Sequence, residues 1–238
     1  MASLPTFKRD LISTCLAHRI LTFGTFTLKS GRQSPYFFNA GLFNTSSLLS
    51  SLSTAYAHTI TSSFSPDQFD LLFGPAYKGI PLSAITCVAL SSVSAGYGDI
   101  GYAFNRKEAK AHGEGGTIVG ADLKGKRIVI IDDVITAGTA IREAVEIIRA
   151  QGGKVVGIVV ALDRQEKVAS ETEKQGGEDD GSERPSTVEM VRRDVGVPVL
   201  AVLTLGDLIE GAKAQSGVSE ADVKRMEEYR ARYGAKDA

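Results

Sequence analysis

Two kinds of hydrophobic pattern take turns along this chain, one typical of strands and one typical of helices. Short continuous apolar runs, such as residues 128–131, indicate parallel strands that are covered on both faces. Longer segments place apolar residues every three or four positions. After that run and a short turn, Ile141, Ala144, Val145 and Ile148 follow this spacing and predict a helix. The alternation predicts an α/β fold, with a mainly parallel sheet flanked by helices.

The predicted elements fill most of the chain and fit a single domain over residues 1–238. Strands are predicted over residues 70–73, 99–105, 127–131, 155–162 and 197–203. Further helices are predicted over residues 46–63 and 80–95, from Ser186 toward Val195, and from about Ser219, where Val223, Met226 and Tyr229 are helically spaced. The Ser186-x-x-Glu189 pattern is typical of a capping box at a helix start.

The N-terminal part, about residues 1–45, is predicted to form a helix–hairpin hood on this domain. Apolar side chains fall on one face of residues 6–19, which predicts an amphipathic helix. Residues 22–28 and 34–40 predict two strands around a turn at residues 29–32.

Two polar stretches interrupt the alternation. Residues 105–117 combine glycines with charges of both signs and predict a mobile loop. Residues 167–185 contain no apolar side chain between Ala169 and Pro185. Such a tract buries too little surface to order itself and is predicted to be a solvated insertion. Deleting residues 171–183 should therefore leave activity largely intact.

Composition narrows the classes of function. Lys and Arg total 27 and Asp and Glu 28, so the net charge of −1 gives no electrostatic basis for binding nucleic acid or a membrane surface. Cys15 and Cys87 form no C-x-x-C pair, which argues against a disulfide framework or a zinc site and fits a reducing compartment. The N-terminus lacks an apolar signal core, and the uncharged segment 79–98 contains Pro81 and several hydroxyl residues, which favours a buried helix. We expect a soluble, cytoplasmic protein.

The end of the run at residues 128–131 carries the most informative chemistry. Asp132 and Asp133 follow it, and the small residues of a Thr136-Ala137-Gly138-Thr139 turn lead into the next helix. Small residues let the backbone approach a ligand, and a helix start offers unpaired N–H groups to an anion. A sugar phosphate with Mg²⁺ fits, because hydroxyls and Mg²⁺ both take oxygen ligands. The alternative is an ordinary α/β ligand turn of unspecified use. No G-x-x-x-x-G-K-[ST] or G-x-G-x-x-G motif supports a nucleoside triphosphatase or a dinucleotide enzyme.

Two further segments are candidates for holding a diphosphate. Residues 106–116, RKEAKAHGEGG, place three cations and a histidine in a loop that could close over a phosphorylated substrate and neutralise developing charge. In residues 74–79, GPAYKG, backbone amides at a helix start and the Lys78 ammonium would hold the same group. The alternatives are a solvated charge run for the first segment and a turn with an exposed lysine for the second.

A hairpin and an arginine are candidates for binding a flat, anionic ligand. Lys29 lies in the hairpin turn, and Phe37 and Phe38 follow in its second strand. An aromatic face can stack on a heterocycle, although composition alone favours hydrophobic packing of these rings. Arg164, directly after the strand at residues 155–162, offers a bidentate fork that suits a planar carboxylate.

These segments resemble, in order and wording, the motifs of the type I phosphoribosyltransferases, and of the orotate phosphoribosyltransferases in particular. DDVITAGTA resembles their ribose-phosphate loop, NRKEAKAHGEGG their catalytic loop, and GPAYKG their diphosphate segment, which often has a cis peptide bond before the tyrosine. Ala111 stands where relatives often carry a polar residue. The resemblance covers nearly the whole chain except residues 167–185.

The resemblance implies transfer of the 5-phosphoribosyl group from 5-phosphoribosyl 1-diphosphate to orotate, giving orotidine 5′-monophosphate and diphosphate in pyrimidine (UMP) biosynthesis. It implies Mg²⁺ bound mainly through the diphosphate, no resident metal ligands, and a homodimer whose basic loops close over the partner's ribose site. The implied substrate contacts are Lys29, Phe37, Phe38, Tyr77, Lys78, Arg106, Lys107, Lys110, His112, Asp132, Asp133, Thr136, Ala137, Gly138, Thr139, Ala140 and Arg164. The implied catalytic residues are Arg106, Lys107, Lys110, His112 and Asp133.

Two alternatives stay open. A phosphoribosyltransferase for another base would keep the loop at residues 132–140, but would not need Phe37 and Phe38 together with Arg164. A non-enzymatic regulator on this fold could bind phosphoribosyl diphosphate as an effector. Such a regulator would be expected to lose the basic loop or to gain a nucleic-acid surface.

Overall fold

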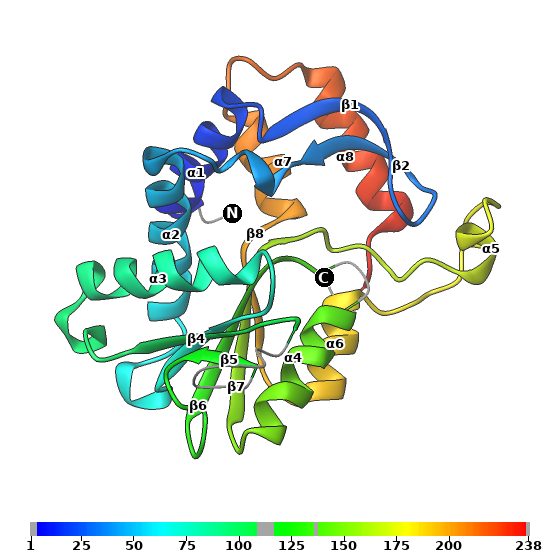
Figure 1. Ribbon diagram of the computed structural model, residues 1–238. Coiled ribbons are helices and arrows are strands. Elements are labelled where there is room, and N and C mark those ends of the chain that lie inside the picture. Colours follow the sequence, from blue (N-terminus) through cyan, green and yellow to red (C-terminus); the bar gives the residue numbers. More distant parts are fainter. Residues whose placement is uncertain (1–3, 109–116, 136–137, 237–238) are drawn as a thin grey trace.

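The computed structural model describes residues 4–108, 117–135 and 138–236. Within them, six strands form one sheet in the order β5-β4-β3-β6-β7-β8 (Figure 1). The strands are β3 (Leu71–Gly74), β4 (Gly101–Asn105), β5 (Ile118–Gly120), β6 (Arg127–Val134), β7 (Lys154–Asp163) and β8 (Val199–Thr204). Every neighbouring pair is parallel except β4 with β5 at one edge. The predicted mainly parallel α/β sheet is confirmed.

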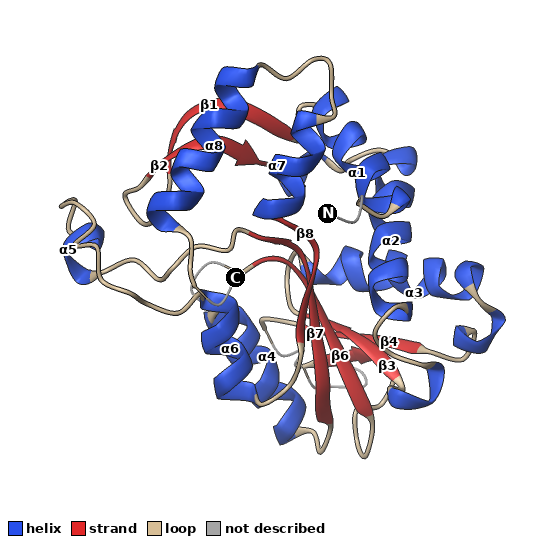
Figure 2. Cartoon of the chain, turned by 180° about the vertical axis from the view of Figure 1, so that it is seen from behind, coloured by secondary structure: helices blue, strands red, loops and turns tan. Residues whose placement is uncertain are grey.

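Helices cover both faces of this sheet, because its central strands are apolar on both sides. Val129 and Ile131 of β6 belong to the core on the side of α2 and α3. Ile128 and Ile130 belong to the core on the side of α4 and α6, and all four side chains are fully buried. Figure 2 shows the two helix layers on opposite sides of the strands. The helices are α2 (Ser46–Thr61), α3 (Gly79–Val93), α4 (Thr139–Ala150) and α6 (Thr187–Val195).

The hood is built from both ends of the chain. Its elements are α1 (Thr6–Ala17), β1 (Leu21–Thr27), β2 (Gln33–Phe38), α7 (Leu205–Lys213) and α8 (Glu220–Tyr233), which lie together in Figure 1. Lys8 of α1 pairs with Asp207 of α7 at 2.7 Å, and Arg225 of α8 donates to the carbonyl oxygen of Gly24 in β1. The predicted hood of residues 1–45 is therefore completed by two C-terminal helices.

The structure departs from the predicted elements in three places. The helix α7 escapes prediction because Gly206 and Gly211 lower its helix propensity. Gly211 is nevertheless required, since an added Cβ would lie 2.5 Å from Cδ1 of Ile12. The edge strand β5 is too short to show a period. Strand β6 continues through Asp132 and Asp133, so the paired acids lie on the strand rather than after it. The other predicted elements are confirmed, with ends shifted by one or two residues.

Most residues of the tract at 171–183 are exposed, but the tract as a whole, residues 167–185, is more ordered than its composition predicts. It contains the short helix α5 (Glu171–Lys174), and the side chains of Lys167 and Glu173 are buried. Its charged groups pair with one another and with Arg32 of the hairpin turn. Ion pairs rather than apolar contacts order the tract, which is why its lack of apolar residues did not indicate this order.

The uncharged segment at residues 79–98 begins with α3. Leu82, Thr86 and Leu90 of this helix are buried, whereas Val88 is 69% exposed, so the predicted buried helix is buried on one face only. In the part of the chain that the structure describes, no helix is both long and apolar enough to cross a membrane.

Candidate active site

Several predicted site residues lie at the carboxyl ends of three neighbouring strands. Lys78 follows β3, Asp132 and Asp133 lie near the end of β6, and Arg164 follows β7. Because β3, β6 and β7 are parallel neighbours, these ends meet at one edge of the sheet. Ligands of open α/β sheets bind at this edge. The topology therefore gathers residues from three separate parts of the chain.

The Lys78 ammonium contacts the Asp133 carboxylate, with Nζ and Oδ2 2.5 Å apart. The Asp133 side chain is 12% exposed, whereas the Lys78 side chain is 70% exposed. A lysine that is open to solvent beside an acid can exchange that partner for a phosphate oxygen. The turn before Lys78 requires glycine, because a Cβ on Gly74 would lie 2.0 Å from the carbonyl oxygen of Gly79.

Asp132 has an unusually basic carboxylate. Burial raises its pKa to about 6, and the Asp133 charge adds to this effect. The Asp133 amide, which donates to Oδ1 of Asp132 at 2.9 Å, and the Lys78 charge oppose the rise. The carbonyl oxygen of Asp132 accepts a 2.6 Å hydrogen bond from the Tyr56 hydroxyl of α2. Tyr56 is absent from the predicted site, although a tyrosine among apolar helix positions signals a buried hydroxyl that needs a partner.

The start of α4 forms the described part of the predicted phosphate cradle. Gly138 is the N-cap residue, with a φ of +74°, and a Cβ there would lie 2.8 Å from a side chain of α6. The first turn, which begins at Thr139 and Ala140, carries no acidic side chain. The positive end of the helix is therefore available to an anion. The predicted phosphate contacts Thr136 and Ala137 lie outside the described residues.

The segment before Lys78 is tied to the start of the basic loop. The Ala76–Tyr77 peptide bond is cis, as the resemblance implies. Tyr77 is exposed, and Nζ of Lys107 lies 5.3 Å from the centre of its ring. The Ala76 amide donates to Oδ1 of the buried Asn105 at 3.0 Å. Asn105 is not among the predicted site residues, because its role depends on a contact with another strand.

The two ends of the basic loop are joined by a hydrogen bond where the loop leaves the sheet. The Arg106 amide donates to the carbonyl oxygen of Thr117 at 2.6 Å, directly beyond the pairing of β4 with β5. Lys110, Ala111 and His112 lie outside the described residues. Their roles and the mobility of the loop therefore stay predictions.

Arg164 is held between the hairpin and the segment after β7. Its Nε donates to Oε1 of Glu166 at 2.7 Å, and its Nη2 donates to Oγ of Ser34 at 3.1 Å. Its guanidinium carbon lies 4.4 Å from the centre of the Tyr36 ring. Because Ser34 and Tyr36 lie on β2, these contacts bring the predicted hairpin site and Arg164 together.

The two adjacent phenylalanines of β2 have different environments. Phe37 is 42% exposed, and its ring lies 5.4 Å from that of Phe26. Phe38 is buried and packs beside Phe43 in the core. Successive side chains of a strand point to opposite faces, so only one ring of the pair is open to a ligand. Lys29, in the hairpin turn, is exposed.

The fold is that of a phosphoribosyltransferase. A family model for the phosphoribosyl transferase domain matches residues 48–190. The orotate phosphoribosyltransferase of Coccidioides immitis (strain RS) is 48% identical over 251 residues, and that of Neurospora crassa is 51% identical over 240 residues. Both alignments cover 100% of this chain and 100% of the relative. The crystal structure of the Francisella tularensis orotate phosphoribosyltransferase matches with a TM-score of 0.78 and 39% identity, covering 95% of this chain and 100% of that one. The chain belongs to the orotate phosphoribosyltransferase family.

Proposed function

We propose that the site at the carboxyl ends of β3, β6 and β7 transfers the 5-phosphoribosyl group of 5-phosphoribosyl 1-diphosphate to orotate. The products are orotidine 5′-monophosphate and diphosphate, and the reaction belongs to pyrimidine (UMP) biosynthesis. The observation that carries this proposal is the Lys78–Asp133 pair at the same sheet edge as the open start of α4. Lys78 provides a cation for the diphosphate, and the neighbouring acids provide carboxylates for the ribose. Membership of the family supports the same reaction.

The ribose 5-phosphate binds between the end of β6 and the start of α4. Backbone amides of residues 136–140 donate to the phosphate, whose charge the helix N-terminus favours. Asp132 and Asp133 accept hydrogen bonds from the ribose hydroxyls. Because Lys78 contacts Asp133, the ribose and the diphosphate are held by adjacent groups.

The reaction breaks the bond between ribose C1 and a diphosphate oxygen, and it joins C1 to a ring nitrogen of orotate, which releases its proton. C1 gains oxocarbenium-like character as diphosphate departs with the bonding electron pair. Lys78, Arg106 and Lys107 neutralise the charge on the departing group, together with Lys110 and His112 of the basic loop. Closure of that loop excludes water from the site.

Orotate lies between the hairpin and Arg164. The Arg164 fork donates to the orotate carboxylate, and its contacts with Glu166, Ser34 and Tyr36 fix the plane of the fork. The exposed ring of Phe37 stacks on the pyrimidine, while the buried Phe38 supports that strand from the core. Lys29 supplies a positive charge to orotate from the turn.

We place Mg²⁺ with the diphosphate substrate. A diphosphate offers several of the oxygen ligands that Mg²⁺ takes. Among the residues described, no group of three or more His, Cys, Asp or Glu side chains is arranged to hold a metal ion. When bound, the ion neutralises charge on the leaving group.

We also propose a homodimer in which the basic loop of each subunit closes over the ribose site of its partner. The resemblance implies this exchange.

We place the enzyme in the cytoplasm, without nucleic-acid or membrane partners. The free cysteines Cys15 and Cys87 fit a reducing compartment. The net charge of −1 offers no field that would attract a polyanion.

An assay with Mg²⁺ and phosphoribosyl diphosphate tests the substrate. Orotate should be consumed, whereas uracil, hypoxanthine and adenine should not, because they lack the carboxylate that Arg164 binds. Arg164→Ala should lower kcat/KM for orotate by about 10- to 10²-fold, since a charge-assisted contact contributes about 1.5–3 kcal/mol. Arg149→Ala, which removes only an exposed pair with Glu146, is the matched control. Equal turnover of uracil and orotate would contradict the proposal.

A further inference from the structure

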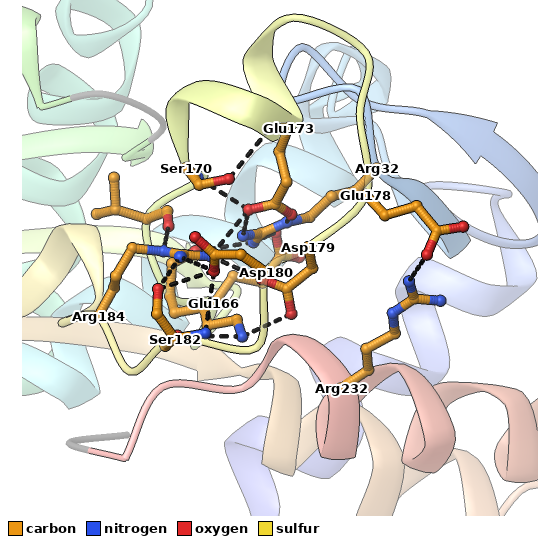
Figure 3. A network of polar contacts seen from close by, with 12 residues as sticks. Arg32, Glu166, Ser170, Glu173, Glu178, Asp179, Asp180, Ser182, Arg184 and Arg232 are labelled. Atoms are coloured by element: carbon orange, nitrogen blue, oxygen red, sulfur yellow. Dashed lines mark hydrogen bonds and ion pairs between the residues drawn. The ribbon is translucent and has the colours of Figure 1, made fainter.

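The tract at residues 167–185 is fastened to the hairpin turn by a buried pair of charges (Figure 3). Arg32 donates from Nε to Oε1 of Glu173 at 2.7 Å and from Nη2 to Oε2 at 3.0 Å. The guanidinium and the carboxylate therefore meet through two parallel hydrogen bonds. Nη1 of Arg32 donates to the carbonyl oxygen of Lys167 at 2.8 Å. The side chains of Arg32 and Glu173 are only 2% and 3% exposed.

The same guanidinium reaches the proposed orotate site through Glu166. Oε2 of Glu166 lies 3.6 Å from Nη1 of Arg32, and Oε1 accepts the hydrogen bond from Nε of Arg164. One carboxylate thus lies between the arginine of the hairpin turn and the arginine assigned to orotate. These side chains are nearly buried, so water screens their charges weakly.

Glu173 is fixed from within the tract as well. Nη2 of Arg184 donates to Glu173 at 3.0 Å and to Asp179 at 2.7 Å. Burial raises the pKa of the Glu173 carboxyl, but hydrogen bonds from Arg32 and from the Ser170 amide outweigh it and hold the pKa below its ordinary value. Glu173 is therefore ionised at neutral pH and held between two arginines.

The backbone of the tract also packs against the hairpin turn. Gly31 has a φ of +85°, and a Cβ there would lie 2.9 Å from the carbonyl oxygen of Glu173. Glycine accommodates both the conformation and the close approach. Since Lys29 belongs to the same turn, α5 supports the segment that carries this proposed substrate contact.

We propose that Arg32 and Glu173 are positioning residues for the orotate site, through which the tract fixes Arg164 and the turn of Lys29. The proposal rests on the proposed role of Arg164 in binding the orotate carboxylate. Arg32 acts on Arg164 through Glu166, and Glu173 acts through Arg32. A displaced fork no longer matches the carboxylate, whereas the groups on β3 and β6 that hold ribose and diphosphate are unaffected. The expectation that residues 171–183 are dispensable is thereby reversed.

Steady-state kinetics of three variants test this positioning role. Glu173→Gln keeps the side-chain size but removes the charge, so KM for orotate should rise about tenfold, while kcat and KM for phosphoribosyl diphosphate stay within about twofold. Arg32→Lys keeps the charge but loses the fork, and should raise KM for orotate by about threefold. Glu178→Gln, in the same tract but with a side chain that is 94% exposed, is the control and should change neither KM.

A folded Glu173→Gln or Arg32→Lys variant with an unchanged KM for orotate would overturn the proposal, even if its melting temperature falls. Should the variants not fold, the wild-type protein decides. Saturating orotidine 5′-monophosphate should slow amide exchange in residues 167–176 by at least about threefold, because coupling between site and tract is reciprocal. Unchanged exchange there would also overturn it. A wild-type protein that does not use orotate would contradict the proposed function instead, and an unaffected Arg164→Ala variant would contradict the role of Arg164.

Discussion

Nζ of Lys78 and Oδ2 of Asp133 lie 2.5 Å apart, so the group assigned to diphosphate and a group assigned to ribose form a direct ion pair. The bond that breaks in the proposed reaction joins these same two parts of the substrate. In the proposed reaction, the pair would therefore lie at the reacting centre. It also explains why a lysine after β3 and an acid on β6 have to be considered together.

Removing the lysine should damage catalysis far more than folding. Lys78→Ala should lower kcat by about 10²-fold, since a positioned charge at the leaving group is lost. The free energy of unfolding should change by no more than about 1 kcal/mol, because Lys78 is largely exposed. Lys213→Ala, which removes an exposed pair with Glu227 at 2.6 Å, is the control and should retain full activity. Denaturant unfolding and initial rates measure both effects, and a Lys78→Ala variant with wild-type kcat would contradict the assignment.

The raised pKa of Asp132 predicts a pH dependence of activity. The pH profile of kcat/KM for phosphoribosyl diphosphate reports the free enzyme. This quantity should fall about tenfold per pH unit below about pH 6, because a protonated Asp132 accepts ribose hydroxyls poorly. Asp132→Asn should be less active but should lack this limb of the profile. An identical limb in the variant would assign the titration to another group, such as the substrate phosphates.

The same pKa shift also predicts a stability difference with a definite sign. A carboxyl whose pKa is higher in the folded than in the unfolded state binds its proton more tightly when folded. Its contribution to stability therefore declines as the pH rises from about 4 to about 6, and is constant above. Asp132→Asn should be more stable than wild type at pH 7, by at most about 3 kcal/mol, since one pKa unit corresponds to about 1.4 kcal/mol. Denaturant unfolding from pH 4 to pH 8 should show this difference narrowing toward pH 4.

The hydroxyl of Tyr56 predicts a link between packing and activity. Tyr56→Phe leaves the partly buried carbonyl oxygen of Asp132 without its 2.6 Å hydrogen bond, which should cost about 1 kcal/mol of stability. Because this bond fixes the strand that carries the paired acids, kcat/KM should also fall about tenfold. Tyr97→Phe removes an equally short bond to the carbonyl oxygen of Phe64, away from the site. It should lose comparable stability with little loss of activity, and similar activities for the two variants would contradict the link.

Local sequence patterns predict those site residues whose position depends only on the strand or turn to which they belong. Asp132 and Asp133 follow a continuous apolar run, and Gly138 precedes a periodic helix, so a short window contains both signals. Tyr56 and Arg32 act through distant partners, 76 and 141 positions further along the chain. No local period records such pairings, because they depend on the order of strands in the sheet and on the placement of the hood.

In the tract at residues 167–185, the local composition gives a misleading prediction. Its lack of apolar residues predicts solvation, yet Lys167, Glu173 and Asp179 have side chains less than a tenth exposed. Charges that satisfy one another can order a segment, provided that a partner such as Arg32 reaches it from elsewhere in the fold. The composition of the tract alone cannot show that such a partner exists.

The proposed exchange of loops between subunits predicts complementation. Lys110→Ala and Asp133→Asn should each be nearly inactive as homodimers. If Lys110 serves the Asp133 of the partner subunit, a mixed dimer holds one site with both defects and one site with neither. Random pairing makes about half of the dimers mixed, so activity should recover to roughly a quarter of wild type.

Mixing Lys110→Ala with His112→Ala is the matched control for this experiment. Both changes lie in the same loop, so every site of a mixed dimer would still meet one defective loop and activity should stay low. Native mass spectrometry establishes that mixed dimers have formed in each case. If mixed Lys110→Ala and Asp133→Asn dimers are present but as inactive as the control, each active site is completed by a loop from its own chain.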